Sequence, residues 1–316
     1  MEVVAEYSPV EVEARAWLNG HKASSGLSWP QIGKLTDVAS STLSMFATGK
    51  YAGNNGAVAA KVLAYRDRLA NQAQLAVHAP VVPSWYETPT AKTLAGLLHS
   101  AQSGEIVLIV TTPGIGKTKV AEWFAANDPN VWLATMSPST SGVPNMAIEV
   151  GEAIGLGEIK GSPQQLSRQI KAHIQGKNGL LIIDEAQELT EKSLNEIRSW
   201  HDKTKVGIAI MGNESVVGQI DGRKSALAQI SSRFYMRHTQ SQPMAGDLEV
   251  LFDAWGIVDA DQRAFLTKVS QLPGALREVT HTIKAASMGA FGAGQELTLA
   301  RLRIAAKQRN VKIGAL

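Results

Sequence analysis

Short apolar runs and helical stretches alternate along residues 105–213. Four of the runs, IVLIV, VWLATM, GLLIID and VGIAIMG, have the length and composition of buried strands. Buried strands that alternate with helices are typical of a parallel sheet covered by helices. From about residue 247 the pattern is helical to the end of the chain. We therefore predict an α/β core followed by a C-terminal helical domain.

The segment VHAPVVPSWYETPT is rich in proline and interrupts this pattern. Proline blocks helix interiors and central strands, so we expect a linker or an extended arm here. It separates a small all-α unit from the larger one. The predicted domains are an N-terminal helical domain at 1–76, the linker at 77–90, the α/β core at 91–240 and the C-terminal helical domain at 241–316.

The composition narrows the class of protein. The 316-residue chain is longer than one ordinary domain, and its 44% hydrophobic content is that of a folded protein. The absence of cysteine excludes disulfides and thiolate zinc sites and favours a reducing compartment. The acidic start lacks the order of a signal peptide, and no stretch approaches the ~18 apolar residues of a membrane span. We expect a cytoplasmic protein with no membrane partner.

The net charge of +3 is mild, but its distribution is uneven. Residues 20–70 and the tail after residue 296 both carry an excess of lysine and arginine. Such patches are either ordinary solvated faces or contact surfaces for nucleic acid.

The sequence TTPGIGKT follows the first predicted strand and opens a helix, which is the context of a phosphate-binding loop. Glycines permit tight backbone geometry, and the N–H groups at the helix start attract phosphate. Lys117 would supply a charge for the β- and γ-phosphates of ATP, and Thr118 a hydroxyl for Mg²⁺. Thr111 replaces the usual first glycine, and we expect the strand end to accommodate it with function kept. The predicted ATP-binding residues of this loop are Pro113, Gly114, Ile115, Gly116, Lys117, Thr118 and Lys119.

The run GLLIIDEAQEL ends an apolar strand in two acids. Asp184 would hold Mg²⁺ together with Thr118, and Glu185 is placed to orient the attacking water. Asn213 ends the next apolar strand, at the sheet edge where ligands bind in such folds, and could position the same water. Its alternative role is that of a helix N-cap. We predict Glu185 and Asn213 as catalytic residues.

Several arginines follow the core. Arg233 could reach the γ-phosphate of a neighbouring subunit as an arginine finger, and Arg237 and Arg223 are weaker candidates. Arg277 is predicted in the early turns of a helix that begins at Pro273, where it could fold over the ATP phosphates. The alternative for each arginine is a surface salt bridge.

These motifs resemble, in order, those of the AAA+ ATPases. TPGIGKT, IIDEAQ, MGN, SSRF and PGALR are similar to Walker A, Walker B, sensor 1, the arginine-finger box and sensor 2 of that family. The resemblance covers roughly residues 85–290. It implies ATP and Mg²⁺ as ligands and an oligomer, either a ring or a helical filament, with nucleotide sites between subunits.

The N-terminal stretch LSWPQIGKLTDVASSTLSMFATGKYAGN has apolar positions spaced for two short helices. It resembles a helix-turn-helix of the lambda-repressor type, with residues 39–47 as the recognition helix. That helix offers no side chain for bidentate base contacts, so we expect DNA binding with weak sequence preference. The alternative is a helical protein-docking module. The predicted DNA contacts of this domain are Ser40, Ser41, Ser44 and Lys50.

A repressor-like module, a proline-rich linker and this core together resemble the target-selection ATPases of DNA transposition. The resemblance implies ATP-bound filaments on double-stranded DNA, delivery of target DNA to a transposase, stimulation of strand transfer, and release of DNA on hydrolysis. It also implies DNA contacts from basic loops of the core. The candidates for those contacts here are Lys160, Arg168, Lys171, Lys203 and Lys205, and ordinary solvated side chains are the alternative.

Three other functions are compatible with parts of the pattern. A replicative helicase loader would share every ATPase motif. A transcriptional regulator that uses ATP as a signal would bind a specific operator. A passive DNA-binding protein with an inactive ATPase is suggested only by Thr111.

Overall fold

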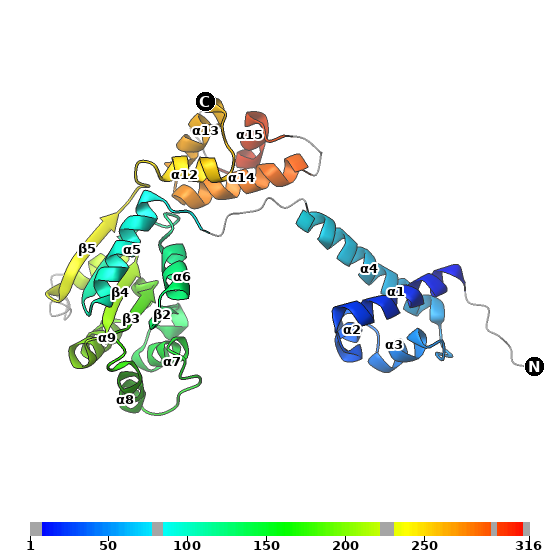
Figure 1. The fold of residues 1–316 in the computed structure, drawn as a ribbon, viewed down its shortest axis with the longest axis horizontal. Helices are drawn as coiled ribbons and strands as arrows, with labels where there is room; N and C mark the ends of the chain where they lie inside the picture. Colours follow the sequence, from blue (N-terminus) through cyan, green and yellow to red (C-terminus); the bar gives the residue numbers. More distant parts are fainter. Residues whose placement is uncertain (1–7, 78–84, 222–230, 292–295, 312–316) are drawn as a thin grey trace, which may run out of the picture. The chain divides into compact units, whose positions relative to one another are not determined.

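The computed structural model describes residues 8–77, 85–221, 231–291 and 296–311. The chain forms two compact units, Met1–Ala79 and Pro80–Leu316 (Figure 1). The predicted α/β core and the predicted C-terminal helical domain both lie in the second unit. Among the described residues no helix is long and apolar enough to cross a membrane.

The first unit consists of helices packed around an apolar centre. Leu18, Ile32, Leu43 and Phe46 are fully buried there, and Ser8 caps the first helix through its side chain. The helices are α1 (Pro9–Ser25), α2 (Trp29–Thr36), α3 (Ser40–Ala47) and α4 (Asn55–Val77).

The turn between α2 and α3 depends on two residues. Asp37 adopts the left-handed conformation (φ 55°), which Asp tolerates better than most residues. A Cβ on Gly33 would lie 2.7 Å from the carbonyl oxygen of Val38, so only glycine fits at that crossing. After this turn the predicted recognition helix, α3, begins at Ser40, one residue later than expected.

The second unit is built on a five-stranded, all-parallel sheet. The order of the strands is β2-β3-β4-β1-β5, so every carboxyl end lies at the same edge. The strands are β1 (Ile106–Thr111), β2 (Val131–Thr135), β3 (Leu180–Asp184), β4 (Gly207–Gly212) and β5 (Phe234–Gln240).

Helices cover both faces of this sheet (Figure 1). One face packs on α5 and α6 through Leu94, Leu98 and Phe124, and the other packs on α7 to α10 through residues such as Ile170 and Trp200. The bounds are α5 (Pro89–Gln102), α6 (Lys117–Asn127), α7 (Val143–Ala153), α8 (Pro163–Ile174), α9 (Glu191–Thr204) and α10 (Glu214–Asp221), with 3₁₀ turns η1 (Pro138–Thr140) and η2 (Ala186–Glu188).

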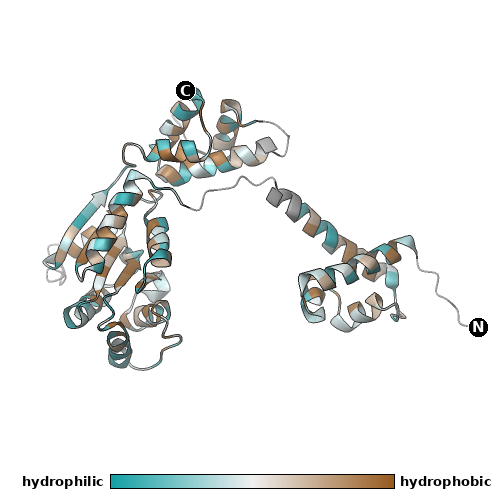
Figure 2. Cartoon of the chain, viewed as in Figure 1, coloured by the Kyte–Doolittle hydropathy of each residue, from teal (hydrophilic) through white to brown (hydrophobic). Residues whose placement is uncertain are grey.

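Strand β5 was not predicted. Strands β1, β3 and β4 are buried along their whole length, whereas most of β5 is exposed at the edge of the sheet, so it lacks a continuous apolar run. Figure 2 shows the contrast: the central strands are mainly hydrophobic, and β5 carries hydrophilic residues along much of its length. It pairs parallel to β1, with Ile106 opposite Phe234 and Thr111 opposite Gln240.

The C-terminal helices surround an apolar cluster of their own, which includes Phe252, Leu266, Ile283 and Leu302. The helix expected from Pro273 begins two residues later. The helices are α12 (Asp247–Ala254), α13 (Ala260–Ser270), α14 (Ala275–Phe291) and α15 (Leu299–Gln308).

Candidate functional site

The predicted phosphate loop joins β1 to α6 at the carboxyl edge of the sheet. Gly114 and Gly116 adopt positive φ values of 90° and 113°, which favour glycine. Among the described residues, none accepts a hydrogen bond from the backbone N–H groups of residues 114–119. Donors left open in this way at a helix start are suited to an anion.

Thr111 is the last residue of β1 and is 2% exposed. Its φ is not positive, so the β-branched side chain is accommodated in extended backbone as expected. Its hydroxyl is buried and has no hydrogen-bond partner among the described residues. The β-branched residue is therefore compatible with the backbone at this strand end, and it places a buried hydroxyl there.

Four side chains, two from the start of α6 and two from the end of β3 and the residue after it, meet below the loop. The ammonium of Lys117 lies 2.9 Å from Asp184 Oδ1 and 3.2 Å from Glu185 Oε1. The Thr118 hydroxyl donates to Asp184 Oδ2 at 2.7 Å. Asp184 is fully buried and Lys117 is 8% exposed, so the pair is shielded from solvent.

This donor set suits a phosphate-bound Mg²⁺. Mg²⁺ prefers oxygen ligands and is usually held by one or two carboxylates together with substrate phosphates. Thr118 and Asp184 supply a hydroxyl and a carboxylate side by side. Among the described residues, this site included, no group of three or more Asp, Glu, His or Cys side chains could hold a metal ion by itself.

Gln187 connects Glu185 to Asn213. Its Nε2 donates to Glu185 Oε2, and its Oε1 accepts from the backbone N–H of Asn213 at 3.3 Å. Asn213 Oδ1 accepts from Ser215 N at 2.9 Å, so Asn213 is the N-cap of α10, the alternative considered above. The Asn213 amide is still at the carboxyl edge of β4, where it lines the cavity.

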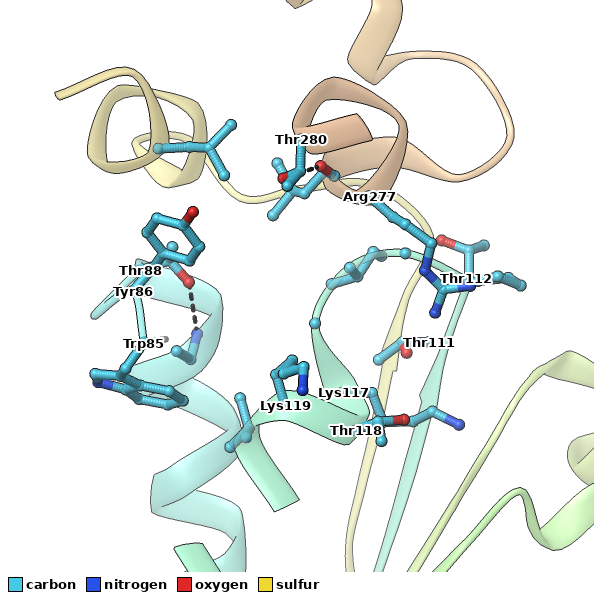
Figure 3. A pocket seen from close by; sticks show the side chains of 18 of the residues that line it. Trp85, Tyr86, Thr88, Thr111, Thr112, Lys117, Thr118, Lys119, Arg277 and Thr280 are labelled. Carbon is cyan, nitrogen blue, oxygen red and sulfur yellow. Dashed lines mark hydrogen bonds between the residues drawn. The ribbon is translucent and has the colours of Figure 1, made fainter. Parts of the chain in front are cut away.

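The loop forms the floor of a cavity of about 780 Å³, within the range of small-molecule sites. Figure 3 shows Trp85 and Tyr86 on one side and Thr111, Thr118 and Arg277 on the other. The Trp85 ring stacks on Trp123 with centroids 4.5 Å apart. Sequence reasoning did not select the two aromatic residues, because they lie in the segment predicted as a linker.

Comparisons with known proteins agree with this geometry. The sequence model of the AAA domain matches residues 100–220, and that of "Mu B transposition protein, C terminal" matches residues 232–308. The chain is 29% identical over 304 residues to the "ATP-dependent target DNA activator B" of Escherichia phage Mu, covering 95% of this chain and 96% of that protein.

A second relative is the "Mu-like prophage FluMu DNA transposition protein B" of Haemophilus influenzae. It is 30% identical over 270 residues, which cover 84% of this chain and 93% of the relative. The chain belongs to the Mu B family of transposition proteins. Among solved structures, the ORC2 protein of Aeropyrum pernix, in ADPNP–ADP complexes, has the same fold, with a TM-score of 0.53 at 15% identity over 72% of this chain and 70% of that one.

In this Mu B family chain the two matched regions meet at the loop. Arg277 lies in the third position of α14, and its backbone N–H donates to the carbonyl of Gly114 at 3.1 Å. Its side chain extends towards the loop above Thr111 (Figure 3), and no described residue pairs with its guanidinium. The salt-bridge alternative is therefore not realised for Arg277.

Arg233 lies elsewhere on this Mu B family core. It immediately precedes β5, so it sits at the amino edge of the sheet, roughly 20 Å from the carboxyl edge for a strand of this length. It pairs with Asp202 at 3.5 Å, and Arg237 pairs with Asp221 at 2.9 Å. Arg233 cannot reach the phosphate loop of its own chain. Arg223 lies outside the described residues.

The remaining predicted residues are spread over the Mu B family chain. Lys119 lines the cavity but pairs with Glu122 at 2.5 Å, and Lys160 pairs with Glu158 at 3.2 Å. The other DNA candidates fall on α3 and just after it (Ser40, Ser41, Ser44 and Lys50), on α8 (Arg168 and Lys171) and at the end of α9 (Lys203 and Lys205).

Proposed function

We propose that this chain is a DNA-stimulated ATPase that assembles on double-stranded DNA, delivers target DNA to a transposase and stimulates strand transfer. The observation that carries the proposal is the cluster of Lys117, Thr118, Asp184 and Glu185, with Lys117 and Asp184 buried, beneath an open phosphate loop. The name of the phage Mu relative, a target DNA activator that depends on ATP, supports the same activity.

Each residue of the cluster has a distinct task. Lys117 leaves its two acids to bind the β- and γ-phosphates, and the open N–H groups of the loop bind the remaining oxygens. Thr118 and Asp184 would hold Mg²⁺, which would neutralise charge on the phosphates. Glu185 accepts the proton of the attacking water, and Asn213 orients that water.

Assembly explains the position of Arg233. An arginine at the amino edge of one sheet completes the site of a neighbouring subunit, which favours a helical filament or a ring. Filaments on DNA would bind with little sequence preference, since backbone contacts carry no sequence information. Hydrolysis would then release the chain from DNA, which clears sites near an existing element and gives target immunity.

Binding to a random-sequence duplex tests the proposal. It should be measured with ATP, with ADP and without nucleotide, at two salt concentrations, with electron micrographs of the same samples. We expect salt-sensitive, ATP-dependent binding with continuous filaments. Nucleotide-independent binding without filaments would contradict the proposal and favour a regulator that binds through its N-terminal unit.

Two variants separate nucleotide binding from turnover. Lys117→Ala should lose ATP binding, filaments and DNA binding together, because the phosphate charge is then unmatched. Glu185→Gln should keep ATP and DNA but stop turnover, so its filaments should persist. Equal DNA binding by both variants would show that ATP does not gate assembly.

The basic side chains near α8 are the proposed contacts of the core with DNA. Replacing Lys160, Arg168 and Lys171 together by alanine should reduce the slope of log K against log salt, by up to about 0.9 for each lost phosphate contact. Lys192→Ala, at an exposed position of α9, is the matched control. An unchanged slope in the triple variant would remove these residues from the DNA surface.

A further inference from the structure

The side chain of Gln187 lies between the two residues that handle the attacking water. It comes from the 3₁₀ turn η2, directly after β3, and it is half-buried. One end of its carboxamide donates to the Glu185 carboxylate, and the other accepts from the backbone N–H of Asn213. No other described residue bridges the ends of β3 and β4 through its side chain in this way.

The orientation of this amide is fixed by its partners. A carboxylate only accepts and a backbone N–H only donates, so Nε2 must face Glu185 and Oε1 must face Asn213. A Cβ on Gly212 would lie 2.8 Å from Gln187 Oε1, so the strand end leaves just enough room for the amide. The backbone carbonyl of Gln187 accepts from Gln219 Nε2 at 2.9 Å, which holds the turn against α10.

The two oxygens of Glu185 have different partners. Oε1 faces Lys117 at 3.2 Å, and Oε2 accepts from Gln187. When Lys117 turns to a phosphate, Oε1 becomes free to accept a proton from water. Gln187 is then the group that still holds the carboxylate in place.

We infer that Gln187 is a positioning residue for ATP hydrolysis: it orients Glu185 and sets the distance between Glu185 and Asn213. The inference rests on the proposed ATPase. Gln187, the last residue of the DEAQ sequence, thereby links the ends of β3 and β4, which neither Glu185 nor Asn213 does alone.

Gln187→Met tests the inference, since methionine keeps the shape and removes both hydrogen bonds. We expect kcat for ATP hydrolysis in the presence of DNA to fall by roughly 10- to 100-fold, the range of effects that follow when a catalytic group is misplaced. The Kd for ATP should change less than about threefold, because the loop and Lys117 are untouched. A value of kcat within about twofold of the wild type would overturn the inference.

Gln219→Met is the matched control. It removes the bond to the Gln187 backbone but leaves the carboxamide with both of its partners, so its loss of kcat should be much smaller. Equal losses in the two variants would mean that anchoring of the turn matters and that the amide does not. A wild-type chain without turnover would instead overturn the proposed function itself, and this inference with it.

Gln187→Glu adds a readout that a purely structural role would not change. Two carboxylates in contact hold one proton between them, so the acid limb of the kcat–pH profile should move to higher pH. Gln187→Met should lower the maximal kcat of this profile without moving its acid limb. An unshifted profile in Gln187→Glu would contradict direct contact between this side chain and Glu185.

Discussion

The backbone N–H of Arg277 donates to the carbonyl of Gly114 at 3.1 Å, so the first turn of α14 lies directly on the phosphate loop. The preceding residues are just as close, because a Cβ on Gly114 would lie 1.9 Å from the carbonyl oxygen of Gly274. The C-terminal helices therefore contact the loop through backbone atoms. The Arg277 side chain is not used in this contact and remains available for a ligand.

Gly114→Ala should abolish nucleotide binding and destabilise the second unit. The new methyl group would collide with backbone that cannot rotate away, and the φ of 90° is unfavourable for alanine. We expect a loss of about 2 kcal/mol or more in the free energy of unfolding, measured by denaturant titration. Gly96→Ala is the control: it lies in open space within α5 and should stabilise the helix by about 0.5–1 kcal/mol. Equal stability of the two variants would contradict the close contact.

Asp247 should be a major determinant of stability where α12 meets α5. Its fully buried carboxylate accepts from Thr90 N at 2.9 Å, from Thr90 Oγ1 at 2.5 Å and from Met244 N at 2.7 Å. Asp247→Ala leaves these donors without an acceptor, so we expect a loss of about 3 kcal/mol. Asp261→Ala, at an exposed position of α13, should cost less than about 0.5 kcal/mol. Thermal denaturation of both variants is the measurement.

Mixing two inactive variants tests whether Arg233 acts between subunits. Arg233→Ala keeps an intact phosphate site, and Glu185→Gln keeps an intact arginine together with ATP and DNA binding. We expect each alone to lose most hydrolysis, and an equimolar mixture with DNA to recover part of it, because some sites then combine both intact parts. A mixture as inactive as its components would place Arg233 in a structural role with Asp202.

Tyr86→Phe should change the dependence of stability on alkaline pH. Burial raises the pKa of the Tyr86 phenol above its ordinary value of 10.0; the nearby Trp255 indole partly offsets this, although the pair does not reach hydrogen-bonding geometry. As the pH rises, the Tyr86 phenol of the folded state therefore keeps its proton to a higher pH than that of the unfolded chain. The stability that this provides is complete below pH 10 and is lost as the pH rises through 10 and above.

The measurement is the difference in melting temperature between the wild type and Tyr86→Phe from pH 7 to 11. The difference should be small and constant up to about pH 9, since no described residue makes a hydrogen bond to the hydroxyl. The wild type should then become relatively less stable. A constant difference over the whole range would contradict the raised pKa.

Much of the site could be predicted from the sequence because its chemistry depends on local patterns. The loop and the acids at the end of β3 are contiguous motifs, and their positions follow from strand and helix order. Asn213 was also placed correctly at the end of β4, and its side chain makes the N-cap bond; its role in positioning water stays a prediction.

Other features depend on tertiary contacts that local patterns do not record. Strand β5 is exposed and lacks an apolar run. Leu35 has the spacing of a core residue but is 43% exposed. The bridge made by Gln187 requires β3 and β4 to be neighbours, which the order of residues along the chain does not specify.

The position of Arg233 across the sheet from Lys117 has a consequence for any linear assembly. If each catalytic centre is shared between neighbours, the two ends of a filament are chemically different. One end displays a phosphate loop that lacks its arginine, and the other displays an arginine that faces no nucleotide. The two ends of the filament would therefore lose subunits at different rates. The terminal loop that lacks an arginine would hydrolyse its ATP last, so subunits would leave from the opposite end or from the interior.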